Sequence, residues 1–177
     1  VPEYTKQELL AFEKEVLGVY VSGHPLDEYA KMWEKHISAR TIDFELDEDT
    51  GETQVKDTSR QTIGGMITSK TVKITKTGQP MAFLILEDLV GTVEVVVFPN
   101  TYSQYRYILD RTEKVFVTGK VQANVDENGK MICEKIVDFD DVPRKLWIRF
   151  ENTQDYISNK EELFCMFNNS QGKDTVI

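Results

Sequence analysis

The sequence predicts a mainly β fold: a five-stranded Greek-key barrel with an N-terminal helical extension and a partial α+β segment after it. Three observations predict this class. Five β-rich runs lie between residues 60 and 140, and turn residues separate most of them. One helical pattern interrupts the runs, between the third and the fourth. Residues 1–41 instead show apolar residues at helical spacing.

The first helix is expected to begin with a capping box. Thr5 and Glu8 are three residues apart, so each side chain can accept a hydrogen bond from the backbone of the other. Apolar residues then recur at helical spacing as far as Tyr20. A turn follows, and Pro25 can open a second helix as its first residue. We expect the buried stripe of that helix to be Leu26, Tyr29, Ala30 and Trp33.

Residues 42–59 are acidic and polar and contain the run ELDEDTGET. We interpret them as a linker between the helices and the barrel. Two interpretations of their charge remain open. The carboxylates either keep a linker solvated, or they also repel nucleic acid from that side of the molecule.

The first barrel strand is expected over residues 63–75. Its early and late apolar residues differ in parity, which predicts a bulge or bend between Thr68 and Thr71. Residues 81–86 are apolar on both parities, which indicates a central strand. Residues 92–98 alternate, with valines on one face.

A short helix is expected to open at Pro99, with Tyr102, Tyr105 and Leu109 on one side. Two further strands, over residues 114–125 and 130–139, complete the set. The order of three strands, a helix and two strands is that of the oligonucleotide-binding (OB) fold. In that fold, the face of strands two and three and the loops joining strands 1–2 and 4–5 bind oligonucleotides.

Beyond the barrel, residues 146–150 alternate as a strand does, and residues 161–167 are expected to form a short helix that packs Leu163 and Phe167 into a core. Residues 172–177 resemble the start of another strand. The spacing of Cys133 and Cys165 matches no metal or redox motif, so we expect two buried thiols.

The lysines of the first strand and its turn are the first candidates for binding a polyanion. No acidic residue occurs from Thr58 to Leu86, where Lys70, Lys73 and Lys76 lie. Each could neutralise a phosphate and release a counterion. The plainer alternative is that they keep a strand soluble. The formal net charge of −9 excludes a wholly basic protein, but residues 60–139 alone carry 10 Lys+Arg against 9 Asp+Glu.

Aromatic side chains supply the stacking surfaces that single-strand binders use. Phe98 has the outward parity of its strand, and Phe83 can equally be a core residue. Tyr102 is a further candidate, although we expect it rather to plug the end of the barrel with Tyr105. Lys120 and Asn124 project from the polar side of the fourth strand. The sequence contains no catalytic set and no group with metal-ligand spacing. The candidate nucleic-acid-binding residues are Lys70, Lys73, Lys76, Phe83, Phe98, Tyr102, Lys120 and Asn124.

Two stretches resemble one protein family. The first is residues 14–29, KEVLGVYVSGHPLDEY. The second is residues 76–109, KTGQPMAFLILEDLVGTVEVVVFPNTYSQYRYIL, followed by KVFVTGKVQANVDENGKMICEKIVDF. Both are similar to the α subunit of bacterial replicative DNA polymerase III. The resemblance implies four parts. These are residues 1–41 after a helix-hairpin-helix region, a linker over 42–59, an OB-fold domain over 60–140, and the opening of a clamp-loader-contacting domain over 141–177.

The resemblance also implies partners and limits. The partners would be single-stranded DNA, the rest of the α chain, and the sliding clamp and clamp loader. The family's paired aspartates that hold Mg²⁺ lie in a palm domain, and no Asp-x-Asp pair lies in a strand context in this sequence. We therefore expect a non-enzyme that needs no cofactor. We further expect a cytoplasmic, nucleoid-associated monomer without a membrane span or signal peptide, cut from a longer chain.

Three functions follow as hypotheses. The first is a non-catalytic module that binds the single-stranded template during DNA replication. The second is an interaction module that organises neighbouring domains and subunits. The third, an anticodon-binding barrel of a tRNA synthetase, leaves residues 14–29 unexplained.

Overall fold

The computed structural model describes residues 4–18, 20–124, 127–142, 145–146, 149–169 and 175–176. The chain divides into two compact units, Val1–Phe139 and Asp140–Ile177, which are described separately. Among the described residues, no helix is long and apolar enough to cross a membrane.

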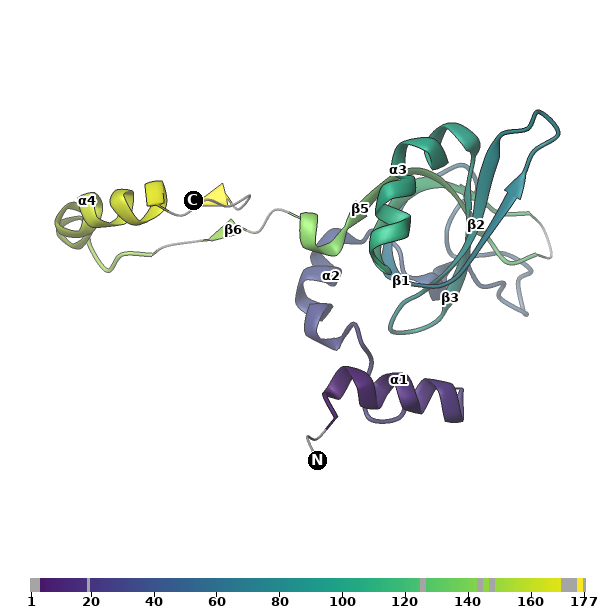
Figure 1. The fold of residues 1–177 in the computed structure, drawn as a ribbon, viewed down its shortest axis with the longest axis horizontal. Helices are drawn as coiled ribbons and strands as arrows, with labels where there is room; N and C mark the ends of the chain where they lie inside the picture. Colours follow the sequence, from purple (N-terminus) through teal and green to yellow (C-terminus); the bar gives the residue numbers. More distant parts are fainter. Residues whose placement is uncertain are drawn as a thin grey trace. The chain divides into compact units, whose positions relative to one another are not determined.

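The first unit is built around a closed β-barrel (Figure 1). Its strands follow the order β1-β2-β3-β5-β4, and β4 closes onto β1. β3 and β5 are parallel, whereas all other neighbours are antiparallel. This arrangement confirms the predicted OB fold. The elements are β1 (Arg60–Ile74), β2 (Pro80–Glu87), β3 (Thr92–Val97), α3 (Pro99–Arg111), β4 (Lys114–Gln122) and β5 (Lys130–Asp138).

β1 is a long strand with a bulge. Its pairing with β2 shifts between Ile67 and Ser69, so Thr68 is the extra residue. Residues 60–66 pair with β4, and residues 66–74 pair with β2 on both sides of the bulge. The bulge lies within the interval that the parity change predicts. Beyond it, β1 and β2 form a hairpin that projects from the barrel (Figure 1).

Alternating residues of all five strands fill the barrel. Leu84, Val95, Val115 and Val117 are fully buried, as inward parity requires. At two points strands approach too closely for any side chain. A Cβ at Gly65 would meet the carbonyl oxygen of Glu87, and one at Gly119 would meet that of Ile132. Glycine at these two positions therefore allows the barrel to close.

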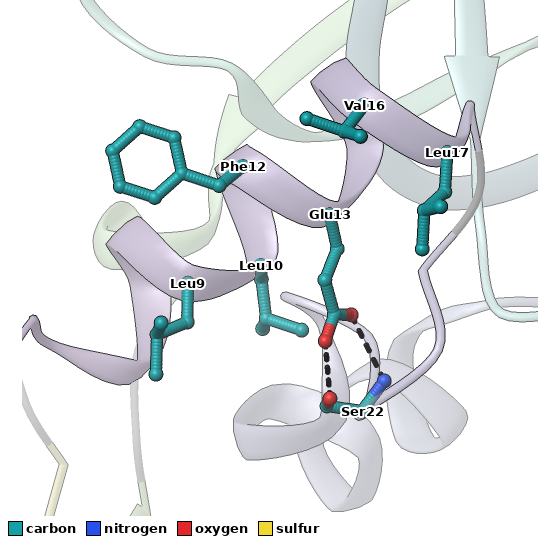
Figure 2. Close-up of a pocket in the computed structure, with 7 residues that line it drawn as sticks. All are labelled: Leu9, Leu10, Phe12, Glu13, Val16, Leu17 and Ser22. Carbon is teal, nitrogen blue, oxygen red and sulfur yellow. Dashed lines mark hydrogen bonds between the residues drawn. The ribbon is translucent and has the colours of Figure 1, made fainter.

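The first helix is α1 (Lys6–Leu17), and it begins with the predicted capping box of Thr5 and Glu8. It ends earlier than the predicted Tyr20, because Gly18 takes a left-handed conformation at φ 76° and its N–H donates to the Lys14 carbonyl. Figure 2 shows the apolar groove along α1, where Glu13 turns back to bind Ser22. Of its apolar residues, Leu10 is buried, whereas Leu9, Phe12, Val16 and Leu17 are exposed.

The second helical segment covers one side of the barrel. It starts with the 3₁₀ turn η1 (Asp27–Tyr29), after the predicted Pro25, and continues as α2 (Ala30–His36). Leu26 and Trp33 are buried as expected, whereas Tyr29 and Ala30 are half-buried. The Trp33 indole N–H donates to the carbonyl of Gly64 in β1 at 2.6 Å.

The acidic stretch 42–59 does more than connect. It begins within the 3₁₀ turn η2 (Thr41–Phe44) and contains one isolated β-bridge between Leu46 and Thr53. Phe44 and Val55 belong to the hydrophobic core. The stretch is therefore fixed to the barrel by apolar burial, which its acidic composition conceals.

The 3₁₀ turn η3 (Phe139–Asp141) begins on the last residue of the first unit and ends in the second. The second unit further contains β6 (Lys145–Leu146), α4 (Thr153–Asn169) and β7 (Thr175–Val176), with β6 and β7 parallel. α4 is longer than the helix predicted over 161–167, and none of its residues is buried, so Leu163 and Phe167 do not enter a core. Cys165 is exposed, which makes the prediction of a buried thiol wrong there; Cys133 is buried. Two parts of the predicted structure lie outside the described residues. They are residues 147–148 of the strand predicted over 146–150, and residues 125–126, where the predicted fourth strand ends and its turn begins.

Candidate nucleic-acid interface

One row of side chains crosses the outside of the barrel from β1 to β4 and back to β1. Residues directly opposite on neighbouring strands share a face of the sheet. The strand register therefore places six residues in one outward row, with strands about 4.8 Å apart. The row consists of Thr71, Phe83, Val96, Ile132, Lys120 and Arg60.

The centre of this row is apolar and its ends are polar. Phe83 and Ile132 are half-buried and Val96 is 8% exposed, so they form a smooth patch on β2, β3 and β5. Thr71 lies at one end, and Lys120 and Arg60 at the other, all exposed. An apolar patch with cationic side chains at one end suits nucleotides, whose bases stack and whose phosphates carry charge.

Lys73 extends this face along β1. It lies opposite Met81 in the register, and its ammonium nitrogen is 4.9 Å from the centroid of the Phe83 ring. This is a cation–π contact at a partly exposed ring. Phe98 follows β3 at the parity of Val96, and 48% of its surface is exposed. The face therefore offers two phenylalanine rings and a cation beside one of them.

Two ion pairs lower the positive charge of the face. The Arg60 guanidinium lies 3.1 Å from a carboxylate oxygen of Glu134, and the Lys130 ammonium lies 3.4 Å from one of Glu94. Within the described part of the chain, the ammonium groups of Lys76 and Lys120 make no ion pair or hydrogen bond. These two lysines and Lys73 are the cations of this face that are not paired with a carboxylate.

Lys70 does not reach this face. It lies opposite the buried Leu84, at the inward parity, and turns toward the C-terminal end of α3. There its ammonium donates to the Leu109 carbonyl and to the Asp110 carboxylate, each at 2.8 Å. The hydrogen bond from Lys70 lowers the pKa of Asp110. Lys70 thus compensates the negative end of the helix dipole.

The two remaining predicted residues lie elsewhere. Tyr102 is 5% exposed and belongs to the hydrophobic core, so its ring offers no free surface. Asn124 is exposed after β4, where its amide donates to Glu127 at 3.2 Å. Five predicted residues remain on or beside the face: Lys73, Lys76, Phe83, Phe98 and Lys120.

Sequence reasoning missed Arg60, Ile132 and Lys130. They join the face because β5 pairs with β3 and β4 pairs with β1. These pairings join segments that are far apart in the sequence, so no local sequence pattern predicts them. The polar parity of β4, which selected Lys120, was the only sequence signal pointing to this side of the barrel.

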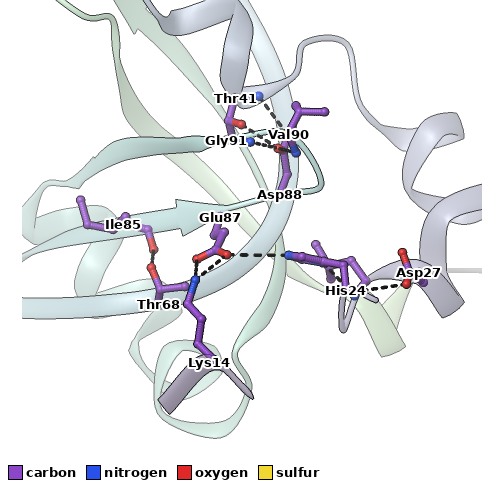
Figure 3. A network of polar contacts seen from close by, with 11 residues as sticks. Lys14, His24, Asp27, Thr41, Thr68, Ile85, Glu87, Asp88, Val90 and Gly91 are labelled. Atoms are coloured by element: carbon purple, nitrogen blue, oxygen red, sulfur yellow. Dashed lines mark hydrogen bonds and ion pairs between the residues drawn. The ribbon is translucent and has the colours of Figure 1, made fainter. Parts of the chain in front are cut away.

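A polar network on the β2–β3 turn holds the N-terminal region against the barrel (Figure 3). Glu87 accepts from Lys14 at 3.0 Å, and the Nε2 atom of His24 lies 3.8 Å from the same carboxylate. The buried Asp88 accepts from the backbone and hydroxyl of Thr41. Burial lowers the pKa of His24, against an opposing effect of Glu87. Among the described residues, no three His, Cys, Asp or Glu side chains gather as a metal site.

Comparison with known proteins supports the same region. Residues 61–139 match the family model described as "OB-fold nucleic acid binding domain". The chain is similar to DNA polymerase III subunit alpha from Borreliella burgdorferi, with 35% identity over 138 residues, 78% of this chain and 11% of that protein. The same subunit from Aquifex aeolicus is 34% identical over 128 residues, 72% of this chain and 10% of that protein.

The similarity covers a small part of each relative. The subunit from Bacillus subtilis is 35% identical over 133 residues, which are 71% of this chain and 11% of that protein. The chain thus spans about a tenth of the length of the curated relatives it matches. Among solved structures, asparaginyl-tRNA synthetase from Pyrococcus horikoshii aligns with 49% of this chain and 21% of its own, at 22% identity and a TM-score of 0.39.

Proposed function

We propose that this chain, an OB-fold barrel similar to part of DNA polymerase III subunit alpha, binds single-stranded DNA as a non-catalytic module that holds the template during replication. The observation that carries the proposal is the outward row across β1, β2, β3, β5 and β4. It combines an apolar centre, an aromatic ring and unpaired cations on the face that OB folds use for oligonucleotides.

The mechanism divides the work between two kinds of contact. Lys73, Lys76 and Lys120 neutralise phosphates and release counterions. Phe83 and Phe98 stack on bases, and each stacked base contributes about 1–3 kcal/mol. Contacts to phosphates carry no sequence information, and stacking on phenylalanine tolerates every base, so binding is independent of sequence. A single strand is favoured because a duplex keeps its base faces covered.

A charge reversal tests the phosphate contacts. The variant Lys73→Glu/Lys120→Glu is compared with Lys31→Glu/Lys35→Glu, which makes the same charge change at two exposed positions on α2. Anisotropy of a labelled oligothymidylate is measured at low salt. We expect the first variant to lose about tenfold or more in affinity and the second to stay close to the wild type. Equal binding by all three proteins would contradict the proposal.

A second pair of variants tests stacking. Phe83→Leu keeps an apolar side chain but removes the ring, and Phe12→Leu makes the same change at the exposed Phe12 of α1. We expect Phe83→Leu to weaken binding by about 5- to 150-fold, the loss of one stacked base. Competition with unlabelled RNA and duplex DNA separates a template-binding role from a tRNA-binding one.

Primer extension with Mg²⁺ and nucleotides tests for polymerase activity, and we expect it to give no product.

The exposed apolar side of α1 favours a second function, that of an organising module. Leu9, Phe12, Val16 and Leu17 line a groove and are 46–78% exposed (Figure 2). In a larger polymerase this groove would pack against a neighbouring domain, and the barrel would orient that domain. If the wild-type chain binds no nucleic acid at low salt, this second function replaces the first.

A further inference from the structure

We infer that the acidic turn, residues 45–52, acts as an electrostatic barrier that ends the nucleic-acid path at the β4–β5 side of the face. The inference rests on the proposed function, and it concerns how many nucleotides the face holds and where a strand leaves it. The acidic turn carries five carboxylates: Glu45, Asp47, Glu48, Asp49 and Glu52.

The acidic turn is attached to the connection between β4 and β5. The backbone N–H of Leu46 donates to the side-chain oxygen of Asn128 at 2.9 Å, and the N–H of Gly129 donates to the Phe44 carbonyl at 2.7 Å. Phe44 is 1% exposed in the barrel core. Hence the acidic turn is held against one of the two loops with which OB folds bind oligonucleotides.

Local hydrogen bonds also fix the shape of the acidic turn. The Asp47 carboxylate accepts from the N–H groups of Asp49 and Thr50, each at 2.9 Å. These bonds lower the pKa of Asp47, so it remains ionised at neutral pH. Gly51, at φ 68°, donates to the Asp47 carbonyl at 2.8 Å. The Asp47 carboxylate and the backbone that carries the other four carboxylates are therefore held in place.

The charge of the face changes sign toward this loop. The next outward row consists of Gln122, Lys130, Glu94, Ile85 and Ser69. In this row Glu94 neutralises Lys130. Asn128 is two residues from Lys130, so their Cα atoms lie within about 7.6 Å. The acidic turn is hydrogen-bonded to Asn128 and so lies at the β4–β5 end of this row.

A DNA strand that lies on the outward row meets cations. A DNA strand that continues toward the β4–β5 connection meets the carboxylates of the acidic turn. Each phosphate placed there would be repelled. The strand must therefore leave the face before this loop, so the face holds few nucleotides. The barrier would also exclude a duplex from this side, since its second backbone would lie against the same charges.

The test neutralises the barrier without disturbing its hydrogen bonds. Glu48→Gln/Asp49→Asn/Glu52→Gln changes three exposed side chains for which no hydrogen bond or ion pair is found in the described part of the chain. The control Glu15→Gln/Glu28→Gln/Glu34→Gln makes the same net-charge change at exposed positions near the N-terminus. Thermal unfolding verifies that both variants fold.

Affinity for labelled oligothymidylates of four and twenty nucleotides is measured at low and at moderate salt. We expect the barrier variant to bind the longer strand about three- to tenfold more tightly than the control variant at low salt. For the four-nucleotide strand, which can avoid the acidic turn, we expect a smaller difference between the variants.

The outcomes separate this inference from the proposed function. If Lys73→Glu/Lys120→Glu loses binding but the barrier variant binds both strands as the control does, the barrier inference alone is wrong. If neither the wild type nor the barrier variant binds any single strand at low salt, both are wrong. A wild type that binds no single strand contradicts the proposed function and the inference that rests on it, even where the barrier variant binds.

Discussion

At the scale of single residues, two lysines three positions apart have different roles. In a strand, side chains alternate between faces, so an odd spacing places Lys70 and Lys73 on opposite sides. Lys73 reaches the Phe83 ring, whereas Lys70 binds the end of α3. The sequence already contained this distinction, because the period of two applies to any strand. Treating the lysines as one group overlooked it.

His24 gives the fold a pH dependence. Its Nε2 atom is buried without a hydrogen-bond partner, and burial lowers its pKa below the ordinary 6.5. The unfolded chain therefore takes up this proton at a higher pH than the folded chain does. The contribution of neutral His24 to the free energy of unfolding is fully present above about pH 6.5. This contribution is lost as the pH falls through the pKa of His24 in the folded state.

Thermal unfolding of the wild type and of His24→Asn between pH 7.5 and 5.5 checks this prediction. An asparagine oxygen can accept the Leu26 N–H that the His24 Nδ1 atom now accepts at 3.1 Å, but it does not titrate. We expect the melting temperature of the wild type to fall more steeply with acidification. Parallel curves for the two proteins would assign the pH dependence to other groups.

At the scale of elements, closure of the barrel depends on Gly119 in β4. A Cβ there would meet the Ile132 carbonyl of β5, and backbone yields less easily than a side chain. We expect Gly119→Ala to lower the free energy of unfolding by about 3 kcal/mol or more. Gly78→Ala is the comparison, because its Cβ meets no atom within 4 Å and its φ of +79° is the main source of strain.

Urea unfolding of both variants measures the difference. Strain from the left-handed backbone alone should cost Gly78→Ala about 1–2 kcal/mol. If both variants lose the same amount, the close approach of β4 and β5 is not a constraint. Affinity for single strands should survive in Gly78→Ala, since the hairpin turn keeps its charge.

Elements differed in how much the sequence revealed about them. The capping box at Thr5 and the bulge at Thr68 follow from local rules, and both were predicted. The end of α1 at Gly18 was missed because a glycine within an apolar pattern can either weaken a helix or terminate it. The burial of Phe44 and Val55 was missed because two apolar residues among many carboxylates give no periodic signal.

At the scale of the whole molecule, binding should be weak and sensitive to salt. The formal net charge is −9, and three lysines on or beside the face lack a carboxylate partner. Each phosphate neutralised on a single strand contributes about 0.7 to the slope of log affinity against log salt concentration. We expect a slope of about −2 for oligothymidylate from a salt titration. A slope near zero would mean that stacking alone supports binding.

The order of strands and helix, and hence the OB fold, could be predicted because each element is encoded locally. The interface could be predicted only in part. Phe83 and Lys120 share the outward row solely because Val96 pairs with Ile132 between them, on strands that are parallel and distant in sequence. Long-range pairing of this kind is a property of the closed barrel rather than of any segment.

The parallel pairing of β3 with β5 has a consequence for how the chain folds. The register pairs residues 94–96 with residues 130–132 across α3 and β4, so this contact is non-local and we expect it to form slowly. Until β5 is paired, β3 and β4 each present an unpaired edge, which can recruit a strand from another chain. We therefore expect a barrel whose β5 is not yet paired to aggregate more readily than the closed barrel.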